Sequence, residues 1–365
     1  MGRKALTKKR RNVNYITPKD SQEAFMKVID LESHFYTEDY IKYLRSRKDF
    51  PREEVRQSNI WLWMGPNLRV PRSFPLEEKL LDMGPKRIEE MDAAGVSIQV
   101  LSLCLPGVER FDAADGAAMA RQTNDELAGV IQKYPDRYIG LAALAPQNPS
   151  EAAKELERSV KKLNLKGAKI NSHVRGEYLD DPKYWVLFEA AESLGVPLYL
   201  HPAIPSPSIL KPYADYGFPL AGPPFGFGAD TALHSMRLIY SGLFDKFTKL
   251  KIVIGHMGEG LPFWLYRIDF YWLKPWVDPE LAPKILRKPS DYVKDNFLMT
   301  SSGMHYLPAV LCAYLALGGD RIAFGADHPF ESSKESLDAL GTLPICDTDL
   351  EKFYHGNAEK LFKMA

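Results

Sequence analysis

The stretch VIDLESHFY, residues 28–36, is the segment that decides the fold. Its apolar first half indicates a buried strand, and the strand ends in Glu32 and His34, followed by Phe35 and Tyr36. Side chains two residues apart on a strand share one face, so the carboxylate and the imidazole are expected to point the same way. A buried acid and a buried histidine need each other, a metal or a ligand, and the stretch therefore predicts a site.

The same arrangement of an apolar run followed by a helical pattern recurs along the chain. The stretch LEEKLLDMGPKRIEEMDAAG, for example, places apolar residues at helical spacing and ends in glycine. About eight strand-then-helix units predict an α/β protein whose parallel sheet closes as a (β/α)8 TIM barrel. An open, doubly wound sheet is the alternative, but no strand end carries G-x-G-x-x-G. The expected strands are 28–35, 97–104, 138–144, 167–171, 197–201, 251–256, 296–301 and 321–327.

Composition limits the classes of function. The 365 residues carry 47 basic and 47 acidic side chains, so the net charge gives no reason to expect nucleic acid or an acidic membrane as partner. No apolar run approaches the length of a membrane span. The three cysteines show no pair spacing, which favours reduced thiols in a cytoplasmic protein.

We expect a basic N-terminal extension, residues 1–27, and a single barrel domain, residues 28–365. The extension has no apolar segment behind it, so it is not expected to be a secretory signal. Three segments do not fit the bare repeat and are predicted to be insertions, at about 37–74, 202–228 and 274–291. Long loops after barrel strands lie on the active-site face, so the first two are expected to form lids or oligomer contacts.

Polar residues gather at the carboxyl ends of four predicted strands. In a barrel these ends converge on one mouth, where Glu32, His34, His201 and Asp327 are expected to meet. Two imidazoles and two carboxylates suit one divalent ion, Zn²⁺ or Mn²⁺, with Mg²⁺ as a further candidate. Each residue alone also has an ordinary structural interpretation, such as a hydrogen-bonded core histidine or a helix cap; the metal interpretation rests on the set. His34 is the least necessary member, because Glu32 alone would represent its strand.

Two further candidates keep alternatives open. His256 and Glu259 either form a pair for proton transfer, or Glu259 lies in the first turn of a helix opened by Gly258, where the dipole favours a carboxylate. Lys169 is either a carbamylated bridge between two metals or a residue that packs or pairs inside the barrel.

Six segments together resemble a known family: LESHF, YLHP, GHMGEGLPFWLYRID, TSSG, GADHPFE and GNAEKLFK. They are similar to the metal-dependent, non-oxidative decarboxylases of the amidohydrolase superfamily, such as γ-resorcylate (2,6-dihydroxybenzoate) and 5-carboxyvanillate decarboxylases. Aminocarboxymuconate semialdehyde decarboxylase is a more distant match. The resemblance runs from about Ile29 to the C-terminus. It implies an amidohydrolase-type barrel with one divalent metal and reversible decarboxylation of a hydroxylated aromatic acid, such as a dihydroxybenzoate, by ring protonation and then loss of CO₂.

The resemblance also implies roles for individual residues. Glu32, His34, His201 and Asp327 match the family's ligands, while Asp327, His256 and Glu259 are its catalytic group, with Asp327 as ring proton donor. Arg267 matches an arginine that members supply to a neighbouring subunit, so a homodimer or homotetramer is expected.

Substrate contacts complete the prediction. Arg72 looks like the family's substrate-contacting arginine, and His328 stands where relatives often have Tyr or Trp, which leaves the recognised ring substituent open. Aromatic Phe35, Phe330 and lid Trp61 or Trp63 are expected to give the ring of a small aromatic acid an apolar slot.

Two other functions fit the same barrel. A lactonase-like hydrolase would use the metal to activate water, and a non-catalytic barrel would keep its ligands without turnover. The aromatic-rich mouth and the GHMGEGLPFWLYRID segment favour decarboxylation.

Overall fold

A computed structural model describes residues 26–364 of the chain except 58, 275 and 283. Its parallel strands form two sheets, in the orders β1–β5–β6 and β12–β11–β10–β9–β8–β7. The strands are β1 (Ile29–Phe35), β5 (Ile98–Leu103), β6 (Tyr138–Gly140), β7 (Ala142–Ala143), β8 (Ala168–Asn171), β9 (Leu198–His201), β10 (Ile252–Ile254), β11 (Phe297–Thr300) and β12 (Ile322–Ala323).

Backbone hydrogen bonds join the two sheets at both edges. β6 and β7 are one strand interrupted at Leu141, whose N–H donates to the Leu101 carbonyl at 2.9 Å. At the other join the Leu31 N–H donates to the Phe324 carbonyl at 3.1 Å, and the Asp327 N–H donates to the Glu32 carbonyl at 3.0 Å. With β6 and β7 counted together, eight parallel strands close into the predicted (β/α)8 barrel.

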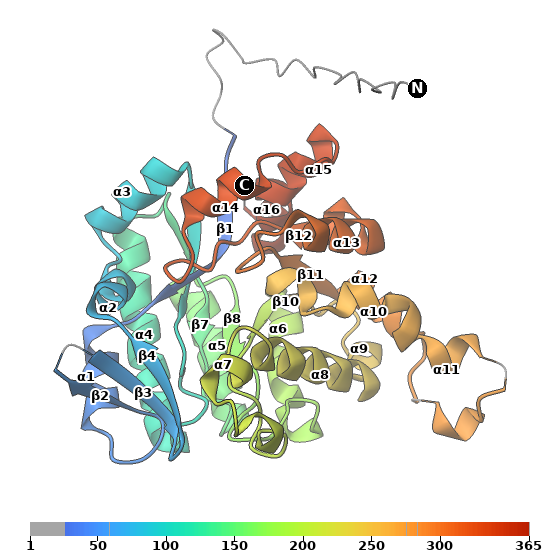
Figure 1. Ribbon diagram of the computed structural model, residues 1–365, viewed down its shortest axis with the longest axis horizontal. Helices are drawn as coiled ribbons and strands as arrows, with labels where there is room; N and C mark the ends of the chain where they lie inside the picture. The colour runs from blue at the N-terminus through green and yellow to red at the C-terminus, as the bar shows by residue number, and fades with distance from the viewer. Residues whose placement is uncertain (1–25, 58, 275, 283, 365) are drawn as a thin grey trace, which may run out of the picture.

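Helices lie outside the strands and bury their apolar faces against them (Figure 1). In α5, for example, Asn148 caps the first turn and Leu156 is buried. The helices are α1 (Glu38–Ser46), α2 (Phe74–Leu81), α3 (Pro85–Ala94), α4 (Ala113–Lys133), α5 (Pro149–Leu163), α6 (Trp185–Leu194), α7 (Phe218–Ala221), α8 (Gly226–Tyr240), α9 (Leu243–Lys246), α10 (Leu261–Ile268), α11 (Phe270–Leu273), α12 (Pro289–Asn296), α13 (Leu307–Leu317), α14 (Ser333–Leu340), α15 (Asp347–Glu351) and α16 (Asn357–Phe362). None of the described helices has both the length and the apolar character required to cross a membrane.

The segments predicted as insertions have structure of their own. Residues 37–74 hold α1 and an antiparallel sheet of β2 (Arg52–Arg56), β3 (Asn59–Gly65) and β4 (Leu68–Arg72). Residues 202–228 hold α7 and the start of α8, and α11 with the segment that follows it projects from the body of the molecule (Figure 1). The predicted N-terminal extension lies almost wholly outside the described residues, and the domain division stays a prediction.

Two strands end earlier than the sequence predicts. β10 stops at Ile254 and β12 at Ala323, so His256 and Asp327 lie on turns beyond them. His256 and Asp327 both have positive φ, at 52° and 73°, a backbone conformation that cannot continue a strand. The turns, rather than the strands, therefore set the directions in which the His256 and Asp327 side chains point.

Candidate metal centre and active-site cavity

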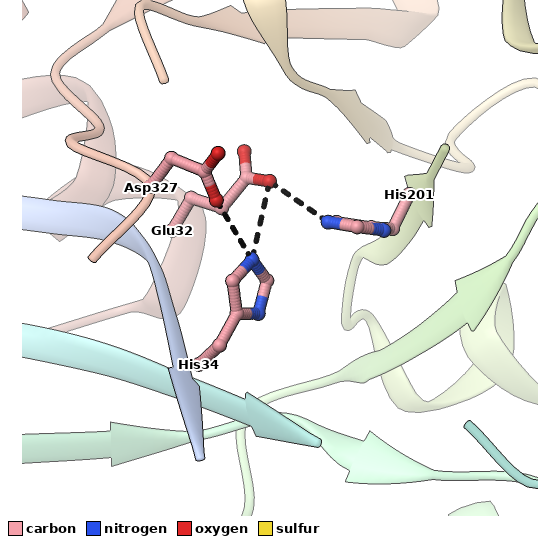
Figure 2. Close-up of side chains that lie close together, drawn as sticks. All are labelled: Glu32, His34, His201 and Asp327. Carbon is pink, nitrogen blue, oxygen red and sulfur yellow. Dashed lines mark hydrogen bonds and ion pairs between the residues drawn. The ribbon is translucent and has the colours of Figure 1, made fainter. Parts of the chain in front are cut away.

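The structure brings the four predicted ligands together from three parts of the barrel. One ligand atom each of Glu32, His34, His201 and Asp327 lies within 4.8 Å of the others (Figure 2). The His201 Nε2 is 3.1 Å from Glu32 Oε1, and the His34 Nε2 is 3.1 Å from Asp327 Oδ1. Four ligand atoms at these separations can surround one cation.

The backbone of β1 explains why two ligands come from one strand. Its pairing register with β5 shifts between Asp30 and Ser33, which is the mark of a β-bulge. Leu31 still packs in the cluster inside the barrel, and Glu32 next to it reaches Tyr199 on β9. The bulge turns Glu32 and His34 towards the interior together.

Hydrogen bonds orient both imidazoles so that each presents Nε2 to the carboxylates. His201 Nδ1 lies 2.7 Å from the Pro202 carbonyl, which only accepts, so Nδ1 carries the hydrogen. His34 Nδ1 lies 3.3 Å from the Ser102 hydroxyl. Burial, aided by the charge of Lys169, lowers the pKa of His201 to about 3, so this ring is neutral at pH 7.

The free oxygen of Glu32 completes the test of whether a metal fits. Oε1 of Glu32 is buried without a hydrogen-bond donor and faces the Nε2 lone pair of neutral His201. Such atoms repel each other unless a cation lies between them, so these residues fit a divalent metal ion.

The cluster opens on a cavity of about 270 Å³. Arg72 and His256 line it together with His34, His201 and Asp327. The Arg72 Nη2 donates to the Leu105 carbonyl at 2.6 Å, while Nη1 is buried without a hydrogen-bond partner, 3.5 Å from Glu53 Oε2. The rest of the lining is mainly apolar: Leu62, Met64, Val70, Pro71, Leu76, Cys104, Leu105, Pro202, Ile204, Phe218, Pro223, Phe227 and Phe330, with the acid Glu331.

His256 and Glu259 form the predicted pair. The His256 Nδ1 is 2.7 Å from Glu259 Oε1. Burial would lower the pKa of His256, but the Glu259 carboxylate outweighs it and raises the pKa to about 10, so the ring is a cation at neutral pH. The alternative placement of Glu259 in a first helical turn is wrong, because α10 begins at Leu261 and Glu259 adopts a left-handed conformation before it.

A match to a protein-family model shows the family to which the chain belongs. The model of the family Amidohydro_2, described as amidohydrolase, matches residues 29–364. The chain belongs to this family. The resemblance found in the sequence is thereby confirmed.

The chain is similar to several named proteins and solved structures of this family. Gamma-resorcylate decarboxylase of Polaromonas sp. is 41% identical over 298 residues, which cover 79% of this chain and 90% of the relative. The structure of a dihydroxybenzoic acid decarboxylase from Polaromonas sp., with bound manganese and 2-nitroresorcinol, superposes with a TM-score of 0.80 at 37% identity over 93% of this chain and 97% of its own. 5-Carboxyvanillate decarboxylase from Sphingomonas paucimobilis gives a TM-score of 0.84 at 34% identity over 93% and 100%.

Several predicted substrate contacts lie elsewhere in this amidohydrolase. Phe35, the last residue of β1, is buried in the large apolar core and does not line the cavity, and His328 lines a neighbouring groove with Glu90. Arg267 is exposed on α10, with its guanidinium 4.7 Å from the Phe270 ring centre. Only Arg72 and Phe330 of the predicted substrate residues line the cavity.

The apolar wall comes from the opposite face of β3 to the one predicted. Leu62 and Met64 line the cavity, while Trp61 and Trp63 do not. Side chains alternate along a strand, so the two sets face opposite sides of the sheet.

Lys169 is buried in the barrel with no hydrogen-bond partner for Nζ, and no second group of metal ligands is found among the described residues.

Proposed function

We propose that this amidohydrolase catalyses the metal-dependent, non-oxidative decarboxylation of a hydroxylated aromatic carboxylic acid. The observation that carries the proposal is the position of the four-ligand cluster, which opens directly on a ring-sized, mainly apolar cavity holding one arginine. Relatives named as gamma-resorcylate decarboxylases support the same chemistry. An ortho-hydroxybenzoate such as a dihydroxybenzoate is the proposed substrate.

Glu32, His34, His201 and Asp327 would hold the metal. When bound, a divalent ion supplies Lewis acidity and a fixed template for the oxygens of the substrate. Manganese is bound in solved relatives, and the nitrogen and oxygen donors here suit Mn²⁺ or Zn²⁺.

Different residues of the cavity would bind different parts of the substrate. The aliphatic side chains of Leu62, Met64 and Val70 meet the ring faces and exclude water. The Nη1 of Arg72, which makes no hydrogen bond and lies 3.5 Å from Glu53 Oε2, would offer a hydrogen bond and a charge to an anionic group of the substrate. Binding therefore fixes the carboxylate relative to Asp327.

Asp327 is the proposed proton donor. Loss of CO₂ directly from the ring would leave an aryl anion, whereas adding a proton first to the carbon that bears the carboxylate avoids it. An ionised ortho hydroxyl donates electron density to that carbon, and a C–H bond forms with the proton of Asp327. The C–C bond then breaks, its electron pair restores aromaticity, and CO₂ leaves. The His256 cation, held by Glu259, stabilises negative charge nearby.

Turnover in D₂O tests the proposed reaction. Because the proton of Asp327 exchanges with solvent, the phenol produced from a dihydroxybenzoate is expected to carry one deuterium on the carbon that bore the carboxylate. Mass spectrometry and ring NMR of the product measure it. The reverse carboxylation of a phenol at high bicarbonate is also expected.

Three other results would contradict the proposal, each in a different way. CO₂ release without ring deuterium would reject protonation as the first step. Hydrolysis of an ester with no CO₂ would reject decarboxylation and favour a lactonase. Stoichiometric metal binding with no turnover across hydroxybenzoates would favour a non-catalytic barrel.

The cytoplasmic location stays a prediction, supported by three cysteines that are all free.

A homodimer or homotetramer is proposed from the exposed surface. α10, α11 and the segment after them expose large apolar side chains, including Phe263 at 77%, Tyr266 at 73% and Trp276 at 72% of their surface. Exposed patches of this kind mark protein interfaces. Arg267 lies among them, so a second copy seated there would receive its guanidinium.

Mixing two inactive variants tests whether Arg267 acts across that interface. An Arg267→Ala chain and an Asp327→Asn chain are expected to be inactive alone. In mixed dimers one of the two sites has both residues intact, so activity is expected to recover to about a quarter of wild type after random exchange. No recovery in mixed oligomers demonstrated by mass spectrometry would contradict a shared site.

A further inference from the structure

The second oxygen of the Glu32 carboxylate is enclosed by hydroxyl groups. Oε2 accepts hydrogen bonds from the Tyr199 and Ser302 hydroxyls, and the Thr300 hydroxyl lies 3.4 Å away. Oε1, by contrast, faces His34 and His201 and receives no hydroxyl. The two oxygens of one carboxylate therefore have different surroundings. We call Tyr199, Thr300 and Ser302 the hydroxyl clamp.

The three hydroxyls of the clamp are also bonded to one another. The Thr300 Oγ1 is 3.0 Å from the Tyr199 hydroxyl and 2.9 Å from the Ser302 Oγ. All three residues are buried, at 3% exposure or less. Tyr199 and Ser302 each donate their single hydrogen to Glu32, and Thr300 Oγ1 is the neighbouring hydroxyl oxygen that contacts both of them.

The clamp connects the ligand cluster to the turn that carries His256. The backbone N–H of His256 donates to the Ser302 Oγ at 3.3 Å. Ser302 thus contacts Glu32 on one side and the His256–Glu259 turn on the other. A shift of this serine would move both the metal ligand and the cationic imidazole.

The absence of a side chain at Gly255 leaves room for the hydroxyl clamp. A Cβ at this position would lie 2.8 Å from Glu32 Oε2, 2.8 Å from the Ser302 Oγ and 3.2 Å from the Tyr199 hydroxyl. Its φ of −77° suits any residue, so the requirement for glycine is steric. The Oε2 side of the carboxylate is therefore packed close to the backbone of Gly255.

We propose that the hydroxyl clamp is a positioning site that holds Glu32 as a one-oxygen metal ligand and aligns it with His256. The inference rests on the proposed metal centre. With Oε2 held by hydroxyl groups, only Oε1 of Glu32 would be available to a metal ion. Without the clamp the carboxylate would be free to change its orientation, and fixing that orientation again would lower the metal affinity. Loss of an outer contact of this kind lowers metal affinity by about 10- to 100-fold.

Manganese binding to two clamp variants tests the proposal. Tyr199→Phe and Ser302→Ala each remove one hydroxyl and keep the packing, and both are expected to raise the Mn²⁺ dissociation constant by about 10- to 100-fold. The free-ion EPR signal measures binding in a titration of metal-free protein, and the spectrum of bound Mn²⁺ is expected to change with the coordination of Glu32. Gly255→Ala is expected to weaken binding by crowding the same oxygen.

Ser301→Ala is the matched control. Ser301 is equally buried and adjacent in sequence, but its hydroxyl bonds to the backbone of Gly325 at 3.0 Å rather than to Glu32. It is expected to change Mn²⁺ affinity by less than about threefold. Thermal unfolding of the metal-free proteins identifies any variant that fails to fold, and either clamp variant alone is sufficient for the test.

The possible results distinguish failure of the hydroxyl clamp proposal from failure of the proposed metal centre. Folded clamp variants that bind Mn²⁺ as tightly as wild type, or an equal loss in Ser301→Ala, would overturn the clamp. A wild-type protein that binds neither Mn²⁺ nor Zn²⁺ would overturn the metal centre itself, and the inference with it.

Discussion

Replacing His201 with alanine is expected to remove the metal and the activity together. His201 supplies the only ligand from β9 in the cluster, and its neutral ring presents Nε2 to the metal position. Losing a direct ligand is expected to weaken metal binding by more than the roughly 100-fold lost with an outer contact. Metal content after dialysis and decarboxylase activity measured on the same sample check this result.

A second buried histidine provides the control for His201→Ala. His234 is fully buried, and its Nε2 accepts a hydrogen bond from the Leu179 N–H at 3.0 Å, away from the ligand cluster. His234→Ala is expected to lower stability but to retain metal in the folded protein. Full metal occupancy in folded His201→Ala would reject the proposed ligand set.

Replacing Asp327 with asparagine is expected to have the largest effect on the chemical step. The amide has nearly the size of the acid but cannot deliver a proton, so kcat is expected to fall by about 10²- to 10⁴-fold. Three ligands remain, so the folded variant is expected to keep part of its metal. Pre-steady-state kinetics with metal-loaded protein separate the chemical step from binding.

Asp327→Asn also distinguishes two roles of the same residue. If Asp327 acts only as a ligand, saturating the variant with Mn²⁺ restores kcat. If it is the proton donor, excess metal leaves kcat low and ring deuteration slow. Recovery of the wild-type kcat in excess Mn²⁺ would therefore contradict the proposed donor.

The sequence was sufficient to predict the barrel and the convergence of its polar strand ends. Each strand carries its apolar signal within a few consecutive residues, and the ring of parallel strands then brings residues as distant as Glu32 and Asp327 together. The early ends of β10 and β12 were not predicted, because His256 and Asp327 adopt positive φ, which depends on the surrounding turns rather than on residue type.

The cavity walls were harder to predict than the ligands. Which face of β3 meets the cavity depends on how the antiparallel sheet docks, and a difference of one residue exchanges Trp61 for Leu62. The hydroxyl clamp was also missed. Tyr199 gave one usable signal, since it lies two residues before His201 and shares its strand face. Ser302 and Thr300 gave none, because hydroxyl residues are common in loops.

The antiparallel sheet of β2, β3 and β4 has a consequence for how new activities arise. It supplies Leu62, Met64, Val70 and Arg72 to the cavity, whereas the four proposed metal ligands come from the barrel strands or the turns that follow them. Its three strands pair only with one another in the described structure. Exchange of this segment between homologues would alter the ring substituents that are accepted while the four proposed metal ligands stay in place, so selection for a new substrate can act on one contiguous stretch of the gene.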